Sequence, residues 1–255
     1  MQRHGYDADG STPTCNQGVG EAYMAQSTRK EDNRLVEVVN SYLDTVAYPQ
    51  TNHMRSITRV TDADRQQEGS DLVVNIDGIE LSCDEKAAVK YIGKPLSTFS
   101  LEIGFMDNHY HQQHHIGWLI DPKHTNDLFS FVWLPQATRP DIQQPSDIIQ
   151  CDIALVRKLD IMNYLESLGW TTKALAKKEW CIRTGQGKTE LGNFQQHGLK
   201  FAISRLLHEQ PVNVLLQKET YMQIAIGRYS IINNKISYIF ERDIDSYIEP
   251  PRIGL

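Results

Sequence analysis

The sequence lacks any apolar run near the roughly 18–20 residues that a membrane-spanning helix needs. Residues 1–10 are polar, so no apolar signal segment is expected there. The four cysteines form no CxxC pair, unlike those of zinc ribbons; they are Cys15, Cys83, Cys151 and Cys181. We therefore expect a soluble, cytoplasmic protein with no membrane partner, in which the cysteines are small buried side chains.

The sequence also lacks a net positive charge. Its formal net charge is −6, which argues against a protein that binds nucleic acid through overall charge alone. A nuclease remains compatible, because acidic catalytic residues add negative charge while one basic face binds the substrate. The segment from Trp170 to Arg205 contains seven basic and two acidic residues, which gives it a local charge of +5. The candidate DNA contacts there are Lys173, Lys177, Lys178, Arg183 and Lys188, although a solvated face would also explain such a run.

Apolar residues make up 40% of the 255 residues, enough for the core of one large domain. Residues 1–26 are rich in Gly, Ser, Thr, Asn and Gln and predict a flexible N-terminal arm, which leaves one domain at 27–255. The capping-box pattern Thr28-Arg-Lys-Glu31 predicts a helix start, and apolar residues recur at helical spacing from Leu35 to Val46. DNA-contacting elements are expected in the C-terminal half of the domain.

The rest of the chain alternates between strand and helix patterns. Strands are expected at Thr98–Phe105, Ile116–Leu134 and Val212–Leu216, with a hairpin at Tyr229–Phe240. Helices are expected at Leu155–Leu168, Thr171–Trp180 and Phe194–Leu207. Because no internal repeat is present, this mixture predicts a single mixed α/β domain.

The most informative segment is a predicted hairpin from Ser70 to Lys86. Asp77-Gly78 is typical of a two-residue type I′ turn, because both positions tolerate positive φ. This turn fixes the register, so that Asp71 lies opposite Asp84. One face is then wholly apolar and comprises Leu72, Val74, Ile76, Ile79, Leu81 and Cys83; the other carries Asp71, Asp84 and Lys86.

Opposed residues in a hairpin have Cβ atoms roughly 4.5–5.5 Å apart, and two carboxylates at that distance repel each other. A divalent cation between Asp71 and Asp84 is the simplest resolution, and oxygen ligands suit Mg²⁺, with Mn²⁺ possible, better than zinc. Lys86 can then orient water or stabilise charge on a phosphate. The alternative is a solvated strand edge, since Asp-x-Lys triplets are common by chance; the register favours the site.

Asp71, followed after twelve residues by Asp84-Glu85-Lys86 on the second strand of a hairpin, resembles the PD-(D/E)XK nuclease superfamily. Ser70 stands where the family name has proline. The run from Asp84 to Ala88, followed by Leu96–Glu102, is similar to type II restriction endonucleases within that superfamily. The resemblance implies a restriction-endonuclease-like α/β fold, with a mixed central sheet flanked by helices, and Mg²⁺-dependent hydrolysis of double-stranded DNA.

The resemblance also implies roles for individual residues. Asp71 and Asp84 would bind the metal with the backbone carbonyl of Glu85, and Lys86 would serve the attacking water. Superfamily members often add an acid from the first helix, for which Glu37 is the candidate. Glu102, on the strand after the hairpin, is a further candidate acid. For both residues the alternative is a solvated position without a role in the site. A homodimer is expected, because cutting both strands with one site per chain usually requires two chains.

Other interpretations stay open. A non-catalytic DNA-binding or assembly protein on a nuclease-like fold is the alternative from another class, and a repair or mobile-element nuclease is the alternative among enzymes. The two short helices within 159–180 suit either a helix-turn-helix reader or plain packing. The histidines of His109–His115 favour a surface loop over a metal site. Thr184–Thr189 resembles part of a phosphate-binding loop, but Ile182 replaces the required glycine, so only a phosphate contact by Lys188 is expected.

Overall fold

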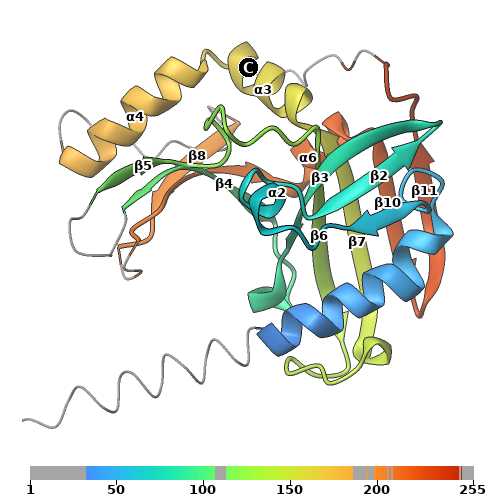
Figure 1. Ribbon diagram of the computed structural model, residues 1–255. Helices are drawn as coiled ribbons and strands as arrows, with labels where there is room; N and C mark the ends of the chain where they lie inside the picture. The colour runs from blue at the N-terminus through green and yellow to red at the C-terminus, as the bar shows by residue number, and fades with distance from the viewer. Residues whose placement is uncertain are drawn as a thin grey trace, which may run out of the picture.

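The computed structural model describes residues 33–106, 113–185, 198–205 and 209–246, together with residues 194, 207 and 248. The predicted arm at 1–26, the capping box, His109, His111 and Lys188 lie outside these described residues. Two β-sheets lie side by side with helices around them (Figure 1). The expected α/β class is thus confirmed as a mixed α/β structure with a large mixed sheet and a second, smaller sheet.

The larger sheet has seven strands in the order β1-β2-β3-β6-β7-β10-β11. Their bounds are β1 (Ile57–Arg59), β2 (Leu72–Ile76), β3 (Ile79–Ala87), β6 (Leu128–Ala137), β7 (Ile148–Arg157), β10 (Gly227–Ile232) and β11 (Lys235–Glu241). β3 and β6 run parallel, whereas every other neighbouring pair is antiparallel. The sheet is therefore mixed, and its one parallel pairing involves the strand that carries Asp84 and Lys86.

The second sheet has the order β5-β4-β9-β8 and is antiparallel throughout. Its strands are β4 (Thr98–Met106), β5 (His114–Ile116), β8 (Leu199–Ile203) and β9 (Val212–Gln217). The chain leaves the larger sheet after β3, forms β4 and β5, and then returns to form β6. An aromatic cluster joins the two sheets, made of Phe99, Phe131, Trp133 and Tyr221.

Residues 33–42 are helical and continue as a π-helical turn, η1 (Leu43–Ala47), and a 3₁₀ turn, η2 (Tyr48–Gln50). This first helix (residues 33–50) lies across one face of the larger sheet (Figure 1). The remaining helices are α2 (Ala63–Gln67), η3 (Val89–Tyr91), η4 (Pro145–Asp147), α3 (Lys158–Ser167), α4 (Thr172–Thr184) and α6 (Lys218–Ile224). Within the described part of the chain, no helix is long and apolar enough to cross a membrane.

The β2–β3 hairpin has the predicted register. Asp77 and Gly78 have φ values of 52° and 87°, as a type I′ turn requires. The pairs run from Ile76 opposite Ile79 to Leu72 opposite Cys83. Most of the predicted apolar face is buried under the first helix, but Ile79 is 46% exposed, because it adjoins the turn at the open end of the ladder.

Two predicted helices are wrong in part. The segment Phe194–Leu207 contains the strand β8 (Leu199–Ile203), where pairing with β9 overrides the apparent helical spacing. The segment Leu155–Leu168 begins with the end of β7, and its helix starts only at Lys158. Buried strands are continuously apolar, so their residues are hard to distinguish from those of a helix by periodicity alone.

Candidate functional site

β3 presents Asp84 and Lys86 on the face that looks toward the second sheet. In the β3–β6 register they pair with Phe129 and Phe131, and the Phe131 ring packs 5.1 Å from Phe99 of β4. The ammonium Nζ of Lys86 lies 2.8 Å from Oδ1 of Asp84. It also lies 4.9 Å from the centre of the Trp118 ring, which holds the lysine stem over an aromatic surface. The two side chains therefore form a fixed pair between the sheets.

Asp71 lies one residue before β2, just beyond the last pair of the hairpin register, Leu72 opposite Cys83. Its main-chain N–H donates to the Cys83 carbonyl at 3.0 Å. Its carboxylate Oδ2 accepts a hydrogen bond from the main-chain N–H of Glu85 at 2.9 Å. Asp71 and Asp84 thus lie together, as the turn-fixed register predicts.

The environment of Asp84 makes its ionised form less favourable than in water. Asp84 is only 3% exposed. Burial raises its pKa to about 7; Lys86 opposes the rise through its charge and hydrogen bond, and Asp71 adds to it. The Lys86 ammonium therefore does not fully offset the rise in pKa that the burial of Asp84 and the charge of Asp71 cause. A divalent cation would, and the residues present fit one.

The main chain of Glu85 faces the open edge of β3. Its N–H points to Asp71, on the β2 side, whereas the N–H of Ala88 donates to Val132 of β6. In a β-strand the N–H and C=O of one residue point to the same side, so the Glu85 carbonyl also points toward Asp71. β2 starts only at Leu72. Two carboxylates and a carbonyl oxygen therefore converge where the strand edge is unpaired.

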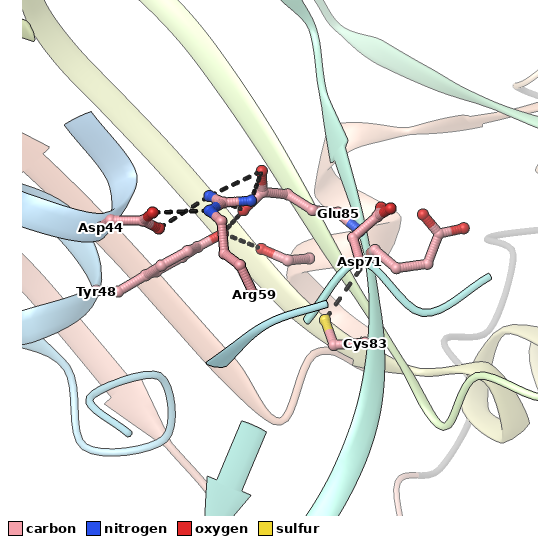
Figure 2. A network of polar contacts seen from close by, with 8 residues as sticks. Asp44, Tyr48, Arg59, Asp71, Cys83 and Glu85 are labelled. Carbon is pink, nitrogen blue, oxygen red and sulfur yellow. Dashed lines mark hydrogen bonds and ion pairs between the residues drawn. The ribbon is translucent and has the colours of Figure 1, made fainter. Parts of the chain in front are cut away.

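The side chain of Glu85 projects to the opposite face, as strand alternation predicts, but it meets polar groups there (Figure 2). The Tyr48 hydroxyl donates to Oε2 of Glu85 at 2.5 Å and lies 3.1 Å from Oγ of Ser130. The Arg59 guanidinium lies 3.4 Å from the same carboxylate and pairs with Asp44 at 2.7 Å. Burial raises the pKa of Glu85, while Arg59 and Tyr48 oppose the rise. No pattern in the sequence indicated this network.

A pocket of about 380 Å³ opens beside the site. Its lining includes Asp71, Glu85 and Lys86 from the hairpin, Asn40 from the first helix, Arg59 from β1 and Phe99 from β4. Asp71, Glu85 and Lys86 are therefore reachable from solvent, whereas Asp84 lies behind them. The pocket carries two cationic side chains, Arg59 and Lys86, and two carboxylates, Asp71 and Glu85.

Of the two further acids predicted from the sequence, Glu102 lies beside the site and Glu37 does not. Glu102 is half-buried on β4; burial raises its pKa to about 7, and the charge of Lys86 opposes the rise. Its carboxylate also accepts a hydrogen bond from the main chain of Trp118. Glu37 is exposed, and the first helix contributes Val36 and Asn40 to the pocket instead.

The predicted basic contacts on α4 differ from one another. Lys173 and Lys177 are exposed, whereas Lys178 lies 5.4 Å from the Phe201 ring. Arg183 pairs with the buried Glu179 at 2.6 Å and donates to the Gln210 carbonyl at 3.2 Å, which leaves its side chain 12% exposed. The structure therefore ties Arg183 into the fold and leaves two lysines free to meet a ligand. Thr171 is the N-cap residue of α4, and its side chain accepts a hydrogen bond from the main-chain N–H of Ala174.

Among the described residues, no group of three or more His, Cys, Asp or Glu side chains is placed to hold a metal ion. The expected ligand set contains only two such side chains, because its third member is a main-chain oxygen. No protein-family model matches the chain, and comparison with curated proteins and with solved structures also finds no match. Any function of this site therefore has to be inferred from the geometry of Asp71, Asp84, Glu85 and Lys86.

Proposed function

We propose that the chain is a Mg²⁺-dependent endodeoxyribonuclease of the PD-(D/E)XK type, and specifically a type II restriction endonuclease that cuts double-stranded DNA at a short sequence. One observation carries the proposal: Asp71, Asp84 and the Glu85 carbonyl converge on the open edge of β3, with Lys86 beside them. The mixed sheet, with a helix across one face, supports a restriction-endonuclease-like fold.

The residues at the strand edge would hold the metal. Asp71 and Asp84 supply carboxylate oxygens and Glu85 supplies its carbonyl oxygen, a hard-ligand set that Mg²⁺ prefers and Mn²⁺ accepts. When bound, the cation would supply positive charge that offsets the charge of the phosphate oxygens. It would also remove the conflict between the two acids, so that Asp84 is ionised at neutral pH.

Lys86 and Glu102 would act on the water and the phosphate. The Lys86 side chain is 29% exposed and reaches the pocket, where it can orient the attacking water and stabilise the developing negative charge. Glu102 lies on the same side with a pKa of about 7, which suits a carboxylate that accepts the proton of that water at neutral pH. The water oxygen bonds to phosphorus as the bond from phosphorus to the leaving ester oxygen breaks.

DNA and a second copy of the chain are the proposed partners. Lys173 and Lys177 on α4 would contact phosphates, since both ammonium groups are exposed. A homodimer would bring two sites to the two strands of the duplex. The cell interior is the proposed location.

Cleavage assays test the proposal directly. Plasmid and genomic DNAs of diverse sequence would be incubated with the protein in Mg²⁺ and in Mn²⁺. Asp84→Ala and Lys86→Ala should each lower cleavage by at least about 100-fold while folding and DNA binding persist. Glu80→Gln is the matched control, because Glu80 is an exposed acid on the same strand. A wild-type protein that binds DNA and cuts none of these substrates would instead be a DNA-binding protein.

A further inference from the structure

Glu85 is held from two sides. On the edge of β3 its N–H is bound by the Asp71 carboxylate at 2.9 Å. On the face toward the first helix, its own carboxylate accepts the Tyr48 hydroxyl at 2.5 Å and lies 3.4 Å from Arg59 (Figure 2). The side chain is only 6% exposed, so water does not replace these contacts. The peptide between Asp84 and Lys86 is therefore fixed both at its backbone and through its side chain.

The first helix sets the position of these contacts. Asp44 belongs to the π-helical turn η1, and Tyr48 follows directly in η2. The Asp44 carboxylate accepts two parallel hydrogen bonds from the Arg59 guanidinium, at 2.7 and 2.8 Å. This bidentate pair orients the guanidinium so that it also faces Glu85. A π-helical turn is a rare irregularity that is frequent at functional sites. Here it carries the residues that meet behind β3.

A buried ionic network is weak evidence for stability, because apolar residues of similar volume often stabilise a core as well or better. The advantage of such a network over apolar packing is that its charged, directional contacts are satisfied in only one arrangement of the side chains. In metal sites, groups that contact the ligands rather than the metal orient those ligands and tune affinity. The network behind β3 holds the side chain of Glu85, and the carbonyl oxygen proposed to bind the metal belongs to the main chain of the same residue. The network would therefore orient a metal ligand without touching the metal.

We infer that Tyr48 and Arg59 are positioning residues that hold Glu85, and with it the metal-binding edge of β3, in place. The inference rests on the proposed function, because it assigns the network to the metal site of that nuclease. The two side chains come from the first helix and from β1, so two segments outside the β2–β3 hairpin contact the residue that carries this carbonyl oxygen. Tyr48 is absent from the pocket lining and Arg59 is part of it, but the contact that the two share is with the Glu85 carboxylate.

Tyr48→Phe tests this with a control from the same helix. Tyr42 is also fully buried, and its hydroxyl has no hydrogen-bond partner among the residues that the structure describes. Tyr48→Phe and Tyr42→Phe therefore each remove one buried oxygen, but only the first frees Glu85. We expect Tyr48→Phe to weaken Mn²⁺ binding, measured by calorimetry without DNA, by about 10-fold or more. The Mn²⁺ concentration for half-maximal cleavage should rise equally, and Tyr42→Phe should leave both unchanged.

Amide hydrogen exchange provides a readout that needs neither metal nor DNA. The Glu85 N–H should exchange faster in Tyr48→Phe than in Tyr42→Phe, and Arg59→Lys, which keeps the charge but loses the planar fork, should act in the same direction. Equal exchange and equal Mn²⁺ affinity in the two Phe variants would overturn the inference and leave the nuclease proposal intact. A wild-type protein without Mn²⁺ binding or cleavage overturns the proposed function, and selective exchange at Glu85 would then still support the positioning role.

Discussion

The carboxylate of Asp71 accepts a hydrogen bond from the main-chain N–H of Glu85 at 2.9 Å. This bond connects the acid that precedes β2 to the strand that carries Asp84 and Lys86. Asp71 therefore has a structural role in addition to its proposed place in the metal site. The two roles can be separated, because an asparagine oxygen still accepts the hydrogen bond but carries no charge.

Asp71→Asn and Asp71→Ala should differ in stability but not in activity. Both should abolish Mg²⁺-dependent cleavage, because each removes a charged ligand. Asp71→Asn should be at least as stable as the wild type without metal, since the repulsion with Asp84 is gone. Asp71→Ala should lose about 1–3 kcal/mol in urea unfolding, because a buried N–H loses its partner. Equal stability of the two variants would show that the Glu85 hydrogen bond contributes nothing.

The raised pKa of Asp84 predicts a pH dependence for the metal-free protein. The ordinary pKa of 3.8 applies to the unfolded chain, and burial raises it to about 7 in the fold. The folded state thus binds the proton more tightly, so this contribution to stability is complete below about pH 4 and is lost as the pH rises through 7. Each unit of difference corresponds to about 1.4 kcal/mol.

Thermal unfolding between pH 4 and pH 8 measures this effect. Asp84→Asn should flatten the decline with rising pH, because it removes the titrating group. Glu102→Gln should flatten it separately, since burial raises the Glu102 pKa to a similar value. Saturating Mg²⁺ should restore stability at neutral pH in the wild type. A decline that persists unchanged in both variants would assign it to other groups.

The basic residues of α4 should separate into two classes. Lys173→Gln with Lys177→Gln should weaken DNA binding and reduce its dependence on salt concentration, by about one charge for each lysine, without loss of stability. Arg183→Gln should instead destabilise the protein by about 3 kcal/mol, because it leaves the buried Glu179 with His114 in place of a permanently charged partner. Binding titrations at several salt concentrations, together with urea unfolding, distinguish the two. An unchanged salt slope in the double variant would exclude this face.

Local patterns in the sequence predicted the centre of the site. Asp77-Gly78 determined the turn, the turn determined the register from Ile76–Ile79 to Leu72–Cys83, and Asp71 follows just beyond it, within reach of Asp84. Each step depends on residues a few positions apart, where backbone geometry leaves few alternatives. The sequence also predicted that Glu85 points away from Lys86, because side chains alternate along a strand.

Contacts between residues far apart in the chain could not be predicted from the sequence. Arg59 lies in a polar stretch with no clear pattern, and only the fold brings it to Asp44 and Glu85. Arg183 resembles any surface cation in sequence, yet Glu179 and the Gln210 carbonyl hold it inside. The strand β8 likewise exists because β9 pairs with it. These features depend on tertiary packing, which a single sequence does not encode in its local periodicity.

The order of the strands has a consequence for how the protein folds. Asp71 and Asp84 lie on strands joined by a two-residue turn, whereas β6, the other neighbour of β3, follows only after β4 and β5. Hairpins form in about 1–10 μs, and pairings across long segments form more slowly because loop closure reduces entropy first. We therefore expect the acid pair to form while still in water, and Asp84 to lose its hydration only when β6 docks. The docking step is then the one at which protons or Mg²⁺ act on folding.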